Sequence, residues 1–297
     1  MFLVKSRSIG SRILYAANVL VLFIFALSCI YPFWYTFSLS ISRKSAANAG
    51  LVTFYPIGFT LSSYKEIISD IKFFNSFWIS IQRTVLGTSL SLLVAIMMAY
   101  PLSKTKKEFK ARNIFMWILI FCMLFNGGLI PWYITVKSYK LLDTIWALVL
   151  GGSVPVFNVI LLMNFFRNFP DDIEEAAIID GSGPWRTLFT VIVPCSFPAI
   201  ATVTLFSGVY HWNEFFNGLV LMSNETKYPL QTYIQQLVVN IPTDTELTPD
   251  QYKRLSELSN KSLDAAKVFI SIIPMLVVYP FLQKYFVSGI MLGAVKE

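Results

Sequence analysis

The chain has 297 residues, of which 55% are hydrophobic and 16% aromatic, while only 14% are charged. A soluble domain carries about a quarter charged residues, so this composition excludes an ordinary soluble protein and predicts a membrane protein with several spans. The net charge of +7 comes mostly from basic residues in short segments between apolar runs, a pattern typical of membrane proteins that argues against nucleic-acid binding.

Six apolar runs are each near or above the roughly 20 residues that cross a bilayer, and they predict six transmembrane helices. They cover residues 13–38, 77–101, 113–133, 141–165, 197–222 and 265–288. The first run is longer than the core of a signal peptide and lacks a small-x-small cleavage site, so we expect an uncleaved span. The predicted fold is all-α, with a short N-terminus (1–12) and a single transmembrane domain (13–297).

Basic residues indicate the orientation of these spans. Segment 102–112 contains five Lys or Arg residues in eleven, and short basic segments stay in the cytoplasm. Six spans place both termini and segment 166–196 on that same cytoplasmic side. Segment 223–264 is then extracytoplasmic, and within it Thr248-Pro249-Asp250 predicts a short surface helix over 249–260.

The polar segment between the fourth and fifth spans predicts a compact helix–turn–helix at the membrane surface. Pro170 followed by Asp171 and Asp172 suits a helix N-terminus, where acids favour the helix dipole. Gly181 can adopt the left-handed conformation that ends such a helix. The first helix is therefore predicted to end at Gly181.

A second helix is predicted directly after it. Ser182 or Gly183 can cap this helix, with Pro184 at its first position. Pro194 and Pro198 then bend the chain into the fifth span. Apolar residues at helical spacing predict one apolar face on the second helix: Trp185, Leu188, Phe189 and Ile192.

The same segment carries a long, gapped motif. Glu175-Ala176-Ala177 is followed after three residues by Gly181, and nine residues later by Val191-x-Val193-Pro194. This resembles the EAA loop of bacterial ABC importer permeases, with Val in place of the family's Ile and Leu. The resemblance implies a type I importer permease fold whose cytoplasmic loop docks on an ATPase subunit. It implies coupling roles for Glu174, Glu175, Ala176, Ala177, Asp180, Gly181, Pro184 and Pro194.

Further segments resemble the carbohydrate-uptake branch of that family: 125–131, 210–216, 228–231 and 279–296. The resemblance implies a bacterial cytoplasmic membrane protein that imports oligosaccharides, with acidic, uronate-containing ones as one hypothesis. Its implied partners are a second homologous permease subunit, two ATPase subunits and an extracytoplasmic solute-binding protein. The sequence has no G-x-x-x-x-G-K-[ST] phosphate loop. We therefore expect no enzyme activity and no cofactor in this chain, with ATP and Mg held by the partner ATPase subunits.

Polar residues inside membrane spans are costly and often functional. The fifth span carries the densest cluster, in which His211 and Glu214 lie at a spacing that shares one helix face. Two readings stay open: contacts to a sugar along the substrate path, and interhelical hydrogen bonds that hold subunits together. The lone His and the three scattered Cys residues indicate no catalytic or metal site. The cluster is His211, Trp212, Asn213, Glu214 and Asn217.

Three other polar residues are candidates for the substrate path. Arg83 lies near the outer start of the second span, where it either snorkels to the interface or awaits an acidic sugar carboxylate. Asn126 precedes Gly127 and Gly128, which either end the third span or break it next to a cavity. Asn158 in the fourth span is a weaker candidate.

Two other classes of function compete with sugar import. A permease of the same architecture could carry a non-sugar solute, such as an amino acid or peptide. A membrane scaffold or receptor could use the acidic loop to bind a cytoplasmic partner. A secondary transporter would need no docking loop of this kind. Ligand-dependent ATP hydrolysis with partner subunits separates an importer from the other classes.

Overall fold

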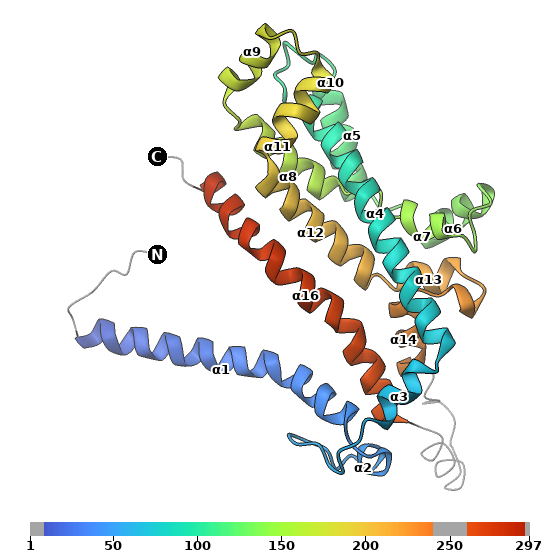
Figure 1. The fold of residues 1–297 in the computed structure, drawn as a ribbon. Coiled ribbons are helices and arrows are strands. Elements are labelled where there is room, and N and C mark those ends of the chain that lie inside the picture. Colours follow the sequence, from blue (N-terminus) through green and yellow to red (C-terminus); the bar gives the residue numbers. More distant parts are fainter. Residues whose placement is uncertain (1–8, 240–259, 295–297) are drawn as a thin grey trace. The chain divides into compact units, whose positions relative to one another are not determined.

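The computed structural model describes residues 9–239 and 260–294, and every regular element in these ranges is a helix (Figure 1). The all-α prediction is confirmed. The longest helices are α1 (Ile9–Ser40), α4 (Ile71–Ser103) and α16 (Lys261–Ala294). The other elements are α2 (Lys44–Asn48), α3 (Ser62–Ile68), α5 (Arg112–Leu124), α6 (Leu129–Ser138), α7 (Ile145–Leu150), α8 (Val156–Arg167), α9 (Asp171–Ile179), α10 (Pro184–Thr187), the π-helix η1 (Leu188–Ile192), α11 (Val193–Cys195), α12 (Phe197–Asn213), α13 (Phe216–Leu221), η2 (Glu225–Lys227) and α14 (Leu230–Val239).

Three of these helices are long and apolar enough to cross a membrane: α1, α4 and the Lys261–Pro280 part of α16. Two bent pairs raise the number to as many as five, judged by length and composition within the described ranges. The pair of α5 and α6 bends by 114°, and the pair of α10–α11 and α12 bends by 85°. The short apolar helix α8 is not counted among these spans because of its length. The number of spans, predicted as six, therefore stays a prediction.

Three of the predicted spans are not continuous helices, which corrects the sequence analysis. The run 113–133 breaks between α5 and α6, where Gly128 has a φ of +87°. The run 141–165 breaks between α7 and α8, where Gly151, Gly152 and Pro155 weaken helical structure. The run 197–222 breaks at Glu214, whose backbone is extended. Hydropathy registers the apolar run but not the break.

The chain divides into two compact units, residues 1–70 with 240–270 and residues 71–239 with 271–297. In the first unit, the Ser262 hydroxyl donates to the carbonyl of Ser42 (2.9 Å), and Lys267 pairs with Asp70 (2.7 Å). Most of α1 is exposed and apolar, as suits a helix that faces lipid. The predicted surface helix at 249–260 lies outside the described residues.

The core of the second unit is built around α4, which packs against α8 and α12 (Figure 1). Small residues of α4 pack there against larger apolar residues of α8 and α12. The five residues of this core with no exposed surface are Ala95, Ala99, Val159, Leu162 and Val203. Small side chains let membrane helices approach closely, and dispersion contacts then hold them together. Helix α14 adds buried residues such as Leu230 from a segment for which the sequence analysis predicted no helix.

The crossing of α4 and α12 depends on one glycine. A Cβ built on Gly87 would lie 2.5 Å from Cε1 of His211, which is closer than any real contact. We expect Gly87→Ala to lower the free energy of unfolding by about 1–3 kcal/mol, because the core must shift to make room. Thermal unfolding of the purified protein measures this.

Gly208→Ala is the matched control, since its new Cβ would meet only Thr88 Oγ1, at 3.7 Å. The better helix propensity of Ala makes this second change neutral or stabilising. Equal stability of the two variants would contradict the proposed crossing.

Candidate functional site

The first helix of the acidic loop (residues 166–196) ends as its sequence predicts. Pro170 caps α9, and Gly181 has a φ of +78°. The Gly181 amide donates to the carbonyl of Ile178 (2.9 Å), and the Ser182 amide donates to that of Ala177 (3.0 Å). These two bonds close a left-handed C-terminal cap. The predicted helix end at Gly181 is confirmed.

The second helix starts as predicted but departs further on. Gly183 is its cap and Pro184 its first residue. The helix then widens into the π-helix η1, which lies between α10 and α11. Leu188 and Ile192 are buried, whereas Trp185 and Phe189 are exposed and stack on each other with ring centroids 6.4 Å apart. The single apolar face predicted for these four residues is wrong, because a π-helical turn changes the angle between successive side chains.

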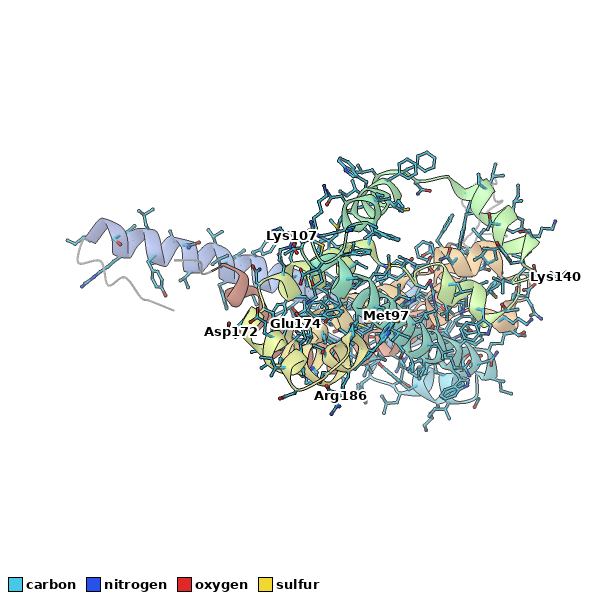
Figure 2. The ribbon with its side chains drawn as sticks, turned by 90° about the horizontal axis from the view of Figure 1, so that it is seen from above. Met97, Lys107, Lys140, Asp172, Glu174 and Arg186 are labelled. Atoms are coloured by element: carbon cyan, nitrogen blue, oxygen red, sulfur yellow. The ribbon has the colours of Figure 1, made fainter. Side chains whose placement is uncertain are left out.

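The exposed side of α9 mixes acidic and apolar residues. Glu175, Ala176 and Asp180 are exposed, while Ala177 is buried. Ile179 beside them is 84% exposed. Exposed apolar side chains rimmed by charge are typical of a protein-binding surface. Figure 2 looks down on this end of the molecule and labels Asp172, Glu174 and Arg186 of the loop.

One acidic residue of the loop turns back toward the chain itself. The Glu174 carboxylate accepts a hydrogen bond from the Tyr100 hydroxyl (2.7 Å) and forms an ion pair with Lys104. The ammonium of Lys104 also lies 4.6 Å from the centre of the Tyr100 ring. Nearby, hydrogen bonds from the hydroxyl and amide of Thr105 hold the pKa of Glu108 below its usual range, so this carboxylate stays ionised.

Within the spans, the structure pairs two residues that lie 131 positions apart. Arg83 of α4 is fully buried, and its guanidinium forms an ion pair with the Glu214 carboxylate. It also donates to the Glu214 backbone carbonyl (2.5 Å). The other carboxylate oxygen of Glu214 accepts from the Asn217 amide (2.8 Å), at the start of α13. Arg83 and Glu214 thus pair two backbone groups at the break after α12, the Glu214 carbonyl and the Asn217 amide.

This geometry corrects the interpretation of Arg83. A snorkelling side chain would reach the interface, but this one is enclosed. A cation awaiting a sugar carboxylate would be free, but Glu214 already neutralises it. An acidic sugar would have to displace Glu214 to reach the guanidinium. Sequence reasoning named both residues and missed their pairing.

The remaining residues of the cluster separate into buried and exposed positions. His211 is buried, with Nε2 3.3 Å from the Ser91 hydroxyl of α4. Trp212 is buried and donates to the carbonyl of Ser271 in α16 (3.1 Å). Asn213 is exposed at the end of α12. Helix-to-helix contacts thus occupy His211 and Trp212, while their role in a substrate path stays a prediction.

Asn158 and Asn126 have different surroundings. The Asn158 amide donates to the Ser207 hydroxyl (3.0 Å), which links α8 to α12 in the core. The Asn126 side-chain oxygen accepts from the Gly128 amide (2.9 Å), which shapes the break between α5 and α6. Asn158 thus makes an interhelical hydrogen bond and Asn126 is a turn residue, while a role of either in a substrate path stays a prediction.

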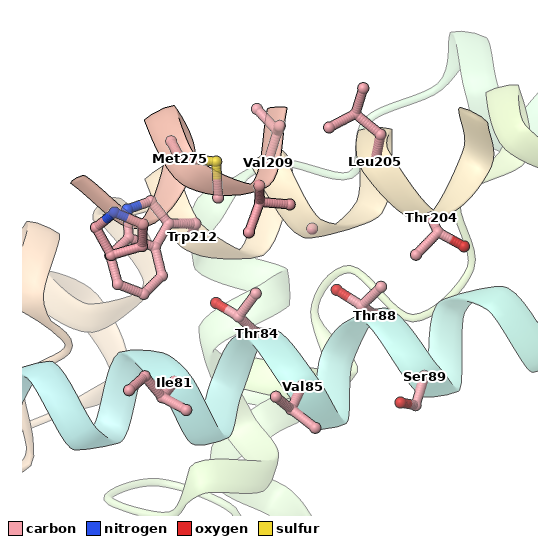
Figure 3. A pocket seen from close by; sticks show the side chains of 13 residues that line it. Ile81, Thr84, Val85, Thr88, Ser89, Thr204, Leu205, Val209, Trp212 and Met275 are labelled. Carbon is pink, nitrogen blue, oxygen red and sulfur yellow. The ribbon is translucent and has the colours of Figure 1, made fainter. Parts of the chain in front are cut away.

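A cavity of about 390 Å³ lies between α4, α12 and α16 (Figure 3). Its walls are mainly apolar, with Trp212 and Met275 at one end. The hydroxyls of Thr84 and Thr88 line it from α4 and have no hydrogen-bond partner. The sequence analysis did not single out this threonine pair, although its four-residue spacing places both on one helix face.

Comparison with known proteins decides the family. Residues 91–291, more than half of the chain, match the family model described as "Binding-protein-dependent transport system inner membrane component". The chain belongs to this family of permeases. The match covers the C-terminal part of α4, the helices α8 and α12, the acidic loop and residues 211–217, and it makes the protein a multi-pass subunit of the inner membrane. Its apolar helices agree with that placement.

Individual relatives extend over nearly the whole permease. It is 38% identical to protein LplC of Bacillus subtilis, over 97% of this chain and 96% of that one. It is 35% identical to the polygalacturonan/rhamnogalacturonan transport system permease protein YtcP of Bacillus subtilis, over 93% and 95%. A solved bacterial ABC transporter involved in import of the acidic polysaccharide alginate matches with a TM-score of 0.84 and 34% identity, covering 95% of this chain and 99% of that chain. The predicted type I importer permease fold is confirmed.

Proposed function

We propose that this permease is the membrane-spanning subunit of an ATP-driven importer of oligosaccharides, with acidic saccharides as its preferred class. The observation that carries the proposal is the full-length likeness to the alginate importer, at 34% identity and a TM-score of 0.84. The relative named for polygalacturonan transport supports it, since that polymer also carries carboxylates.

The energy for transport comes from separate ATPase subunits that hold ATP and Mg. The exposed acidic and apolar side of α9 is the surface we assign to their docking. With the basic segment 102–112 on the same side, this loop and both termini lie in the cytoplasm. A second permease subunit and an extracytoplasmic binding protein complete the complex. ATP-driven closure of the ATPase pair would switch access from outside to inside as a rigid-body transition.

The mechanism divides the roles within the chain. Docking residues on the exposed side of α9 receive the displacement, with Glu175 as the charged contact and Gly181 as the turn that presents it. Packed helices α4, α8 and α12 carry the displacement across the bilayer. The break at Glu214 gives the fifth span a polar, irregular segment of the kind that lines substrate paths in transporters.

Reconstitution tests the proposal. The chain is purified with its partner permease, ATPase subunits and binding protein, and ATP hydrolysis is measured with a panel of saccharides. We expect alginate or polygalacturonate oligosaccharides to stimulate hydrolysis more than neutral oligosaccharides of equal length.

Two other results would each overturn a part of the proposal. Stimulation by amino acids or peptides alone would favour the permease for a non-sugar solute. A chain that binds no ATPase subunit would favour the scaffold or receptor.

A further inference from the structure

The acidic loop contacts a membrane-spanning helix at one defined place. Glu174 lies in α9 near its N-terminus, Tyr100 lies in the last turn of α4, and Lys104 directly follows the last residue of α4. The carboxylate accepts from the Tyr100 hydroxyl at 2.7 Å and pairs with the Lys104 ammonium. The pair is largely shielded, with side chains 19% and 21% exposed. Shielding makes a charged contact stronger and more rigid than a surface pair.

The electrostatics of the two helix ends favour this contact. The last carbonyls of α4 carry partial negative charge, which attracts the Lys104 ammonium. The first amides of α9 carry partial positive charge, which attracts the Glu174 carboxylate. The Tyr100 hydroxyl adds a hydrogen bond to an ionised acceptor, and such bonds are stronger than those between neutral groups. The geometry therefore holds the start of α9 against the end of α4.

Helix α4 is the element through which a movement of the loop would reach the rest of the second unit. It is continuous from Ile71 to Ser103 and packs against α8 and α12. From Tyr100 to Arg83 it spans 17 residues, or about 25 Å. Arg83 holds the break after α12 through Glu214. A displacement of α9 that moves α4 would therefore act directly on the polar cluster.

We infer that Glu174, together with Tyr100 and Lys104, is a positioning site that fastens the ATPase-docking helix to α4. The inference rests on the proposed function, because it assigns the route by which docking force enters the membrane helices. Glu175, the next residue, is exposed and available to the partner. The two adjacent glutamates thus have different roles: Glu174 holds the loop to α4, and Glu175 faces the ATPase.

Coupled transport by the reconstituted complex tests this route. Glu174→Gln and Lys104→Met each remove the ion pair with little change in side-chain volume. We expect either variant to bind the ATPase and hydrolyse ATP normally, while uptake per ATP hydrolysed falls roughly tenfold. The double variant is expected to be no worse than either single one, because both remove the same contact.

Lys107→Met is the matched control for Lys104→Met, since Lys107 is an exposed lysine three residues further along the same basic segment. It is expected to keep normal uptake per ATP. Uptake in Glu174→Gln equal to that of the control would overturn the inference. So would a parallel fall of uptake and hydrolysis, which indicates only a damaged fold.

A second measurement does not depend on the saccharide. With the native cysteines replaced, spin labels at Ile173→Cys and Met97→Cys report the separation of α9 and α4, since both positions are exposed. We expect the separation to be the same in nucleotide-free and ATP-bound complexes, and to change with nucleotide in Glu174→Gln. A separation that already changes in the otherwise unaltered protein would overturn the inference. Failure of the proposed function would show differently, as absence of ATPase binding.

Discussion

Gly181→Pro is expected to leave the protein inserted in the membrane and to abolish transport driven by ATP. Gly181 has a φ of +78°, and its amide donates to the carbonyl of Ile178. Proline fixes φ near −65° and has no amide hydrogen, so the cap that ends α9 cannot form. The docking helix then loses its orientation. Uptake into proteoliposomes and co-purification of the ATPase subunits measure the effect.

Gly183→Ala provides the control for this substitution. Gly183 lies two residues further on, has a φ of −73°, and a Cβ there meets nothing within 4 Å. This change is expected to leave transport within about twofold of normal, since no strain or clash arises. Glu175→Lys should also abolish ATP-driven transport, but without changing the conformation of the loop, because Glu175 is exposed. Normal transport in Gly181→Pro would refute the assignment of the loop to ATPase docking.

Breaking the Arg83–Glu214 pair is expected to destabilise the protein severely. Removing one partner of a buried pair leaves an uncompensated charge, which typically costs about 3–5 kcal/mol. Arg83→Met should therefore lower the thermal unfolding temperature strongly, as should Glu214→Gln. The double variant Arg83→Met with Glu214→Gln should destabilise the protein by less than the sum of the two single effects, because no charge then remains unpaired. Thermal unfolding in detergent measures all three variants.

The same pair predicts how Arg83 influences the choice of substrate. Since Glu214 occupies the guanidinium, we expect Arg83→Gln to reduce uptake of acidic and neutral saccharides equally. A selective loss for acidic saccharides would show instead that the sugar displaces Glu214 during transport. Comparing alginate oligosaccharides with neutral ones of equal length separates the two results.

Local signals made the acidic loop predictable from the sequence. The cap at Pro170, the left-handed turn at Gly181 and the helix start at Pro184 each depend on residues within one turn of the helix. The backbone preferences of Pro and Gly act at that range. The π-helix η1 has no such local signal, and it separated Trp185 and Phe189 from the buried side of their helix.

Contacts distant in sequence could not be predicted in this way. Glu174 lies 74 residues from Tyr100, and periodicity does not report which helices become neighbours. The breaks within the third, fourth and fifth spans were hidden for a related reason. Hydropathy averages over a window, whereas a break depends on a few residues such as Gly128 or Glu214.

The order of synthesis gives the buried ion pair a further consequence. Arg83 and Glu214 are separated by 131 residues, and ribosomes add about 5–20 residues per second. Arg83 is therefore made, and enters the membrane, roughly 7–26 seconds ahead of its counter-charge. During that interval, water, lipid headgroups or the insertion machinery must solvate the guanidinium. Both charges belong to one polypeptide. The guanidinium therefore needs no other solvation once α12 and Glu214 have entered the membrane, and insertion does not depend on another subunit.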